Sequence, residues 1–159
     1  MNNSIFISIR PYSCDDIDVL IDLFRKAVRQ GAVAHYSDVQ REAWAPDDID
    51  RDAWIAKCSR KPTWVAVSNA IVIGFADLEP DGHIDMLYVH PDYHRQGVGR
   101  TLLLHIESVA RRQLISRLYT EASIGARPVF DRAGFALIKE QIVLHNGQRF
   151  VNFYMQKQL

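Results

Sequence analysis

HPDYHRQGVGRTLLLH, residues 90–105, places two glycines at the point where an amphipathic helix begins. In a helix interior, each glycine costs up to about 1 kcal/mol relative to alanine. From Val98 onward, apolar residues keep a helical period at positions 98, 102, 106, 109 and 110. The first turn of a helix carries unpaired N–H groups at the positive end of its dipole, and glycine lets a ligand approach them closely. Gly97 and Gly99 therefore indicate either a plain strand-to-helix turn or an anion-binding site.

The composition is that of one soluble globular domain spanning residues 1–159. The chain is 48% hydrophobic and 24% charged, a balance typical of such domains. Its 19 basic and 19 acidic residues give a net charge of zero. Proteins that bind nucleic acid or membrane surfaces through their overall field need a basic excess. We therefore expect neither of these partners.

The cysteines and the apolar runs favour a reducing compartment. Cys14 and Cys58 lie far apart and belong to no CxxC motif, so they are expected to be free thiols. The longest apolar run, residues 70–76, is far shorter than the roughly 18 residues of a membrane span. The first ten residues lack the basic region of a signal peptide. We expect a cytoplasmic protein.

Patterns of apolar residues and turn residues predict the order of the elements. Helices are expected over 14–30, after Ser37, over 50–57, from Val98 to about 112, and around Pro128. Strands are expected over 5–10, 64–68, 71–79, 83–89 and 117–123, and in a hairpin about Asn146–Gly147. This order predicts an α/β (α+β) fold: a single mixed, mostly antiparallel sheet of about seven strands flanked by about four helices.

The glycine turn lacks two common phosphate-binding motifs and has the signature of another. The chain contains no GxxxxGK[ST], and no third glycine follows at Rossmann spacing. Residues 94–99, HRQGVG, follow the strand end Leu87-Tyr88-Val89 and precede the helix. This arrangement resembles the [QR]-x-x-G-x-[GA] signature of the GNAT superfamily of acyl-CoA-dependent N-acetyltransferases.

Other segments carry the same resemblance nearly from end to end. TEASIGARPVFDRAGF, residues 120–135, is similar to the superfamily's second block of strand, short helix and Gly-Phe. The chain also resembles acetyltransferases of the YafP type in IDML, in NFYM and in five residues of its first half: His35, Tyr36, Ser37, Gln40 and Trp44. The resemblance implies a GNAT fold and a cytoplasmic acyltransferase that uses acetyl-CoA.

The resemblance also implies which residues bind coenzyme A. They are Leu87, Tyr88, Val89, His94, Arg95, Gln96, Gly97, Val98, Gly99, Arg100, Ser123 and Phe130. The backbone N–H groups of residues 96–100 are expected to bind the pyrophosphate, and the edge of strand 83–89 the pantetheine arm. His94 stands where the signature has Gln or Arg. Because backbone groups bind most of the phosphate, we expect this change to be tolerated.

Candidate proton-transfer residues lie on the same strand. Strand periodicity puts His83, Asp85 and Leu87 on one face and Ile84, Met86 and Tyr88 on the other. The resemblance implies proton-relay roles for His83 and Asp85, while a solvated histidine and a structural carboxylate are the alternatives. Glu79 is a weaker candidate base. The developing oxyanion needs a donor, and the resemblance implies that it is a backbone N–H of Leu87 or Val89.

A general acid is harder to place. Many relatives have a tyrosine at the position of Phe130, which has no proton to give. Tyr154, Tyr88 and Ser123 are the candidate hydroxyls, with Tyr154 preferred. A thiol with a pKa of about 8.5 also leaves well without an acid.

The acceptor is expected to be a primary amine of a small molecule or a peptide. His35, Tyr36 and Trp44 are candidate substrate-binding residues, although Trp44 is equally well explained as a core residue. His90 and His94 flank Pro91, which breaks any helix between them, so we expect no metal site. Two alternatives are a catalytically weak acyl-CoA sensor and an acetyltransferase that targets protein or tRNA. Many relatives form homodimers, and the sequence leaves the oligomeric state open.

Overall fold

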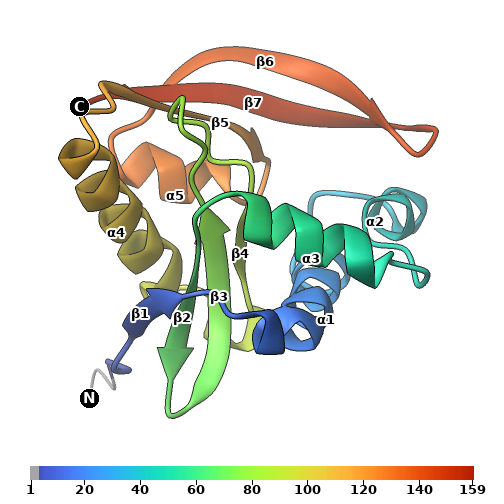
Figure 1. Ribbon diagram of the computed structural model, residues 1–159. Coiled ribbons are helices and arrows are strands. Elements are labelled where there is room, and N and C mark those ends of the chain that lie inside the picture. Colours follow the sequence, from blue (N-terminus) through green and yellow to red (C-terminus); the bar gives the residue numbers. More distant parts are fainter. Residues whose placement is uncertain (1–3) are drawn as a thin grey trace.

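The computed structural model describes residues 4–159, in which seven strands form two sheets (Figure 1). The antiparallel first sheet has the order β1-β2-β3-β4, with bounds Ser8–Pro11, Thr63–Ser68, Ile71–Asp77 and Leu87–Val89. The antiparallel second sheet has the order β5-β7-β6, with bounds Arg117–Ser123 for β5, Gln148–Gln158 for β7 and Ala136–His145 for β6. The second sheet lies across one end of the first (Figure 1).

The five α-helices form two groups: three lie on one side of the first sheet, and two lie on the other side, where the last of them packs against β5 of the second sheet (Figure 1). The first group is α1 (Ile17–Arg29), α2 (Asp38–Trp44) and α3 (Arg51–Arg60); the second is α4 (Val98–Arg112) and α5 (Arg127–Arg132). Short 3-10 turns span Cys14–Asp16 and Pro91–Tyr93. Each group buries its own core, with Leu20 and Phe24 on the α1 side and Leu102 and Ile106 on the α4 side. No helix between residues 4 and 159 is long and apolar enough to cross a bilayer.

Local signals in the sequence set several of these boundaries. The Ser37 hydroxyl accepts from the Gln40 N–H at 3.2 Å, and the Gln40 side chain accepts from the Ser37 N–H at 2.8 Å. This capping box starts α2 where the sequence predicts a helix. Asn146 and Gly147 both have positive φ (45° and 75°), as a two-residue type I′ turn requires. The predicted fold class is confirmed, with seven strands and five helices.

The strands form two sheets where a single sheet was expected, because the backbone changes course at residues 85–86. The two sheets share an isolated parallel bridge between His83 and Tyr119, and β4 spans only Leu87–Val89. Between them, the N–H groups of Asp85 and Met86 both donate to Oδ1 of Asp77, each at 2.9 Å. The expected shared face of Ile84, Met86 and Tyr88 is therefore wrong: Ile84 enters the α4-side core, and Met86 and Tyr88 pack on the α1 side.

Candidate active site

The N-terminus of α4 presents a row of backbone donors. Gly97 precedes the helix at φ 85°, and Arg95 also has positive φ, at 58°. Within residues 4–159, the N–H groups of residues 95–100 have no hydrogen-bond acceptor, whereas Thr101 N–H donates to the Gly97 carbonyl at 2.9 Å. A Cβ added at Gly97 would meet nothing within 4 Å, so this surface is open. The turn therefore has the donors, the helix dipole and the access that an anion requires.

The outer edge of β4 offers a second set of backbone groups, of which the Val89 carbonyl is in contact with the His94 ring. His90 N–H donates to Ile73 O at 2.9 Å, and Asp77 N–H donates to Met86 O at 3.2 Å. Backbone groups of successive strand residues point in opposite directions, so those of Leu87 and Val89 point away from β3. β4 is the last strand of its sheet, and just before it Ile84 N–H donates to Tyr119 O of β5 on this outer side. Beyond Ile84 the two strands are not paired, and we call the space between β4 and β5 the opening. A ligand with amide groups can pair along this edge as a further strand would.

Two side chains of the glycine turn, His94 and Gln96, contact backbone carbonyls and not the N–H groups of residues 95–100. An imidazole nitrogen of His94 lies 3.3 Å from Val89 O, and the Gln96 amide donates to Asp92 O at 3.0 Å. A Cβ on Gly99 would come within 3.1 Å of the Val129 side chain. Gly99 is therefore required for close packing of α4 on α5, and Gly97 for the backbone conformation at φ 85°.

A cavity of about 330 Å³ lies on the other side of β4, between α1, α2, α3 and the tip of the β6–β7 hairpin. Aromatic rings from four elements line it: Phe24, Trp44, Trp54 and Tyr88. Its charged lining residues are Asp48, Asp50, Lys57 and Asp85. The hairpin tip is held over it by Asn146, whose side-chain amide donates to Ala43 O at 2.7 Å. The cavity thus combines apolar walls with an excess of carboxylates.

Tyr88 is part of the wall of this cavity. Its ring packs 4.9 Å from Phe24 and 5.5 Å from Phe75, and the Trp44 indole N–H donates to its hydroxyl at 3.3 Å. Burial raises the pKa of Tyr88 to about 12. The hydroxyl therefore stays protonated near neutral pH. The backbone of β4 forms the edge of its sheet, whereas the Tyr88 side chain lines the cavity.

Asp85 lies in the cavity between two lysines. Its carboxylate is 3.0 Å from the Lys57 ammonium and 3.1 Å from the Lys61 ammonium. Burial by itself would raise the pKa of Asp85, but the charges and hydrogen bonds of Lys57 and Lys61 outweigh it and lower that pKa. Asp85 is therefore ionised near neutral pH and is a weak base in the free protein.

His83 occupies the bridge between the two sheets. Its Nε2 lies 2.6 Å from Glu121, its Nδ1 lies 3.5 Å from Glu79, and its ring stacks on Tyr119 with the centroids 4.8 Å apart. Burial would lower the pKa of His83, but the hydrogen bond and charge of Glu121 outweigh it and raise that pKa. Glu79 also contacts Lys61 at 3.1 Å. A polar chain of His83, Glu79 and Lys61 thus connects the bridge with Asp85.

Replacing His83 with glutamine should remove a pH-dependent part of the stability. Because the pKa of His83 is raised by folding, its contribution is fully present below the ordinary histidine pKa of about 6.5 and is lost as pH rises through the folded pKa. The difference in unfolding free energy between wild type and His83→Gln should therefore be largest at about pH 6 and shrink toward about pH 9. Urea unfolding at a series of pH values measures it. A constant difference would contradict the assignment.

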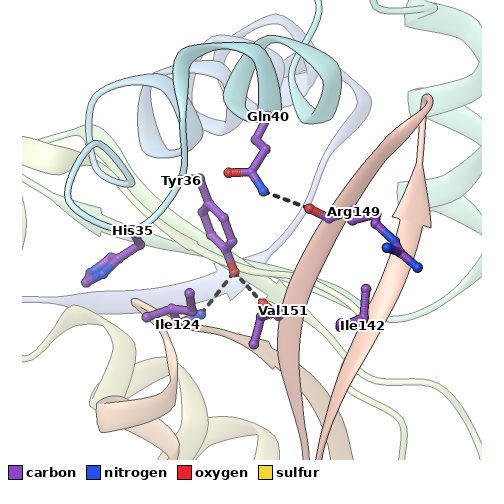
Figure 2. Close-up of a pocket in the computed structure, with 7 residues that line it drawn as sticks. All are labelled: His35, Tyr36, Gln40, Ile124, Ile142, Arg149 and Val151. Carbon is purple, nitrogen blue, oxygen red and sulfur yellow. Dashed lines mark hydrogen bonds between the residues drawn. The ribbon is translucent and has the colours of Figure 1, made fainter.

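The three candidate substrate residues line two different cavities. His35 and Tyr36 line a smaller cavity of about 120 Å³, shown in Figure 2, with Gln40, Ile124, Ile142, Arg149 and Val151. Trp44 lines the larger one. The Tyr36 hydroxyl donates to Val151 O at 2.9 Å and accepts from Ile124 N–H at 3.2 Å. Tyr36 therefore connects the segment before α2 to β7 and to the end of β5.

Replacing Tyr36 with phenylalanine should lower the unfolding free energy by about 1–2 kcal/mol, because it leaves a carbonyl and an N–H without their partner. Chemical denaturation measures this loss. If Tyr36 acts only through structure, the variant should keep the wild-type KM for the amine. A raised KM at unchanged stability would instead support the predicted role in substrate binding.

The second sheet and α5 hold the other candidates. Ser123 Oγ accepts from the Ala126 N–H at 3.2 Å. Phe130 is 2% exposed and packs against Phe135, so we assign its side chain to the core. Tyr154 pairs with Glu121 in the β5–β7 ladder, and its ring lies 6.0 Å from that of Tyr119. Tyr154 is thus a neighbour of the His83–Glu121 pair.

Sequence reasoning did not identify Lys57, Lys61, Asp77 or Glu121. The one local signal was a carboxylate, Asp77, at the end of the apolar run IVIGFA. The lysines lie on or after α3, and only folding brings them to β4. Among residues 4–159, no three histidine, cysteine, aspartate or glutamate side chains are arranged to hold a metal ion.

Known proteins share both the sequence and the fold of this chain. The family described as "Acetyltransferase (GNAT) domain" matches residues 32–159. The uncharacterized N-acetyltransferase YafP of Escherichia coli (strain K12) is 40% identical over 98% of this chain and 97% of its own. A GCN5-related N-acetyltransferase from Rhodopseudomonas palustris superposes with a TM-score of 0.92 at 35% identity, covering 96% of this chain and 95% of that one. The PaiA N-acetyltransferase of Thermoplasma acidophilum, solved with coenzyme A, shares the fold at a TM-score of 0.80 and 20% identity, covering 97% and 99%.

Proposed function

The chain belongs to the GNAT family of N-acetyltransferases, and from this premise we propose that it transfers the acetyl group of acetyl-CoA to the primary amine of a small molecule. The observation that carries the proposal is the row of unpaired N–H groups at residues 95–100, next to the free edge of β4. The first fits a pyrophosphate, and the second fits an arm that contains amides. The two features are joined by a short turn, residues 90–94.

Acetyl-CoA is a cosubstrate in this proposal. The N–H groups of residues 95–100 bind its pyrophosphate, with the side chains of Arg95 and Arg100 adding positive charge. The pantetheine arm pairs with Leu87 and Val89. The thioester then lies in the opening between β4 and β5, where an N–H of Leu87 or Val89 donates to its carbonyl oxygen. No metal is needed for this chemistry.

The transfer forms a C–N bond and breaks the C–S bond. An alkyl ammonium with a pKa of about 10.4 is only about a thousandth neutral at pH 7, so the proton must leave before attack. Asp85 attracts and orients the acceptor amine, and water and the His83–Glu79 pair carry the proton away. Coenzyme A leaves as the thiolate, and Tyr154 is the candidate hydroxyl to protonate it. The proton that the nitrogen loses after attack returns to Tyr154 through water.

The cavity of about 330 Å³ supports an acceptor of limited size. Its four aromatic rings suit a carbon skeleton, and its carboxylates suit an ammonium group. The Trp44 ring packs 4.5 Å from His145 at the hairpin tip, which narrows the side through which a long peptide would pass. A small amine therefore fits better than a peptide, and Trp44 is the candidate substrate contact.

A thiol-release assay with acetyl-CoA and a panel of amines tests the proposal, together with calorimetry of coenzyme A binding. Turnover on small amines is the expected result. Tight binding of coenzyme A without turnover on any amine or peptide would favour an acyl-CoA sensor. The motive for this alternative is Phe130, which stands where many relatives have a tyrosine. Acetylated proteins or tRNA in an incubated cell extract, without turnover on small amines, would assign the activity to macromolecules.

A further inference from the structure

Asp77, the last residue of β3, is a completely buried carboxylate that contacts two backbone N–H groups and one lysine. Its exposed fraction is 0%. Oδ1 accepts from two consecutive N–H groups, those of Asp85 and Met86, each at 2.9 Å. Oδ2 lies 2.7 Å from the Lys61 ammonium, whose side chain is 4% exposed. One buried side chain thus holds the backbone that leads into β4.

The two N–H groups bound by Asp77 lie where the chain changes its hydrogen-bonding direction. Ile84 N–H donates to Tyr119 O at 2.9 Å, toward β5. Two residues later, Met86 O accepts from Asp77 N–H at 3.2 Å, toward β3. In a regular strand, residues two apart point the same way. The backbone therefore reverses its direction between Ile84 and Met86, at the residues that Asp77 binds.

This reversal decides which backbone groups of β4 face the opening. With it, Leu87 and Val89 point toward β5. Without it, the alternation that begins at Ile84 would continue, and the N–H and carbonyl of Tyr88 would point there instead. The Tyr88 side chain would then also leave the wall of the cavity, where it now packs on Phe24.

Lys61 offsets the free-energy cost of burying the charged Asp77 carboxylate. Burial by itself would lower the pKa of Lys61, but the hydrogen bond and charge of Asp77, with Asp85, outweigh it and raise that pKa. Lys61 is therefore a permanent cation that also contacts Glu79 and Asp85, both at 3.1 Å. A buried carboxylate without such a partner would be strongly destabilising.

We propose that Asp77 is a positioning residue for acyl transfer: by binding the N–H groups of Asp85 and Met86, it turns the N–H groups of Leu87 and Val89 toward the thioester. Lys61 supports this role by neutralising Asp77 inside the protein. The inference rests on the proposed function, because it assumes that acetyl-CoA lies along β4.

Two double variants separate the acceptor oxygen from the charge pair. Asp77→Asn with Lys61→Met removes both charges but keeps a side-chain oxygen for the two N–H groups. Asp77→Leu with Lys61→Met also removes both charges and keeps the same branched arrangement of side-chain heavy atoms at 77, but has no acceptor. The Asn pair should keep the KM for acetyl-CoA within about threefold of wild type. The kcat/KM for acetyl-CoA of the Leu pair should be about tenfold to a hundredfold below that of the Asn pair, as expected for misplaced oxyanion and cofactor donors.

A merely structural role would affect both folded pairs alike, so equal kcat/KM values for acetyl-CoA would overturn the proposal. If the Leu pair does not fold, Asp77→Glu replaces it, because it keeps the charge for Lys61 but moves the acceptor by one methylene. The same loss is expected, and a kcat/KM equal to that of the Asn pair would again overturn the proposal. Wild-type turnover measured in parallel tests the proposed function separately. If wild type binds coenzyme A without turnover, the same comparison is made on its Kd by calorimetry.

Discussion

Valine in place of Gly97 is expected to weaken coenzyme A binding at least about 30-fold, equivalent to about 2 kcal/mol. Gly97 has φ 85°, a conformation that costs other residues about 1–2 kcal/mol and a β-branched residue more. A valine there either keeps this conformation and places its side chain in the open space above the turn, or relaxes and reorients the N–H groups of residues 95–100. Both outcomes remove part of the pyrophosphate site.

Calorimetry of coenzyme A binding measures the effect, with Gly147→Val as the matched control. Gly147 also has positive φ, 75°, and a Cβ there would also meet nothing within 4 Å. It lies in the β6–β7 turn, far along the chain from α4. The control should lose stability but bind coenzyme A as wild type does. Wild-type affinity in Gly97→Val would mean that the turn is only a connection between strand and helix.

Asparagine in place of Asp85 is expected to lower kcat/KM for the amine by about tenfold to a hundredfold, with coenzyme A affinity unchanged. The substitution removes the carboxylate that attracts the acceptor and leaves the Lys57 and Lys61 ammonium groups without this partner. Truncating one partner of a buried charge pair typically costs about 2–5 kcal/mol of binding free energy. Because Asp85 is partly exposed, we expect its contribution to binding the ammonium group to lie in the lower part of that range.

The pH dependence separates an orienting role of Asp85 from a role as general base. The pKa of Asp85 is lowered, so it is ionised at every pH above its ordinary range. The rate between about pH 7 and pH 9 should then follow the neutral fraction of the amine, rising about tenfold per unit in both wild type and variant. A change in this slope in Asp85→Asn would show that Asp85 takes the proton. Asp48→Asn, which removes an exposed carboxylate of the same cavity, is the control and should lose much less.

The candidate site was predictable where it depends on the backbone of one continuous segment. The signature at residues 94–99 predicted a turn with free N–H groups, and the structure has one there, because glycine at positive φ and a helix start are local properties. The roles of the side chains were harder to predict from the sequence. Asp85 was identified, but its two lysine partners come from the end of α3 and the loop after it, and their effect on its pKa depends on distances that no spacing rule contains. Likewise, Tyr36 and Trp44 were grouped together, although they line different cavities.

By itself, the sequence determined the element order, the capping of α2, the type I′ turn at Asn146–Gly147 and the glycine turn before α4. Each of these depends on the conformational preferences of neighbouring residues or on a short hydrophobic period. Only the tertiary structure decided that the strands form two sheets and which amides of β4 face the opening between them. A buried carboxylate needs partners for its oxygen atoms and its charge, and Asp77 has them in N–H groups eight and nine residues away and in the Lys61 ammonium. These contacts form only in the folded chain, so the sequence could not show them. The pattern of HIDMLYV predicts one continuous strand, but the structure has a strand of three residues, Leu87–Val89, at the edge of its sheet.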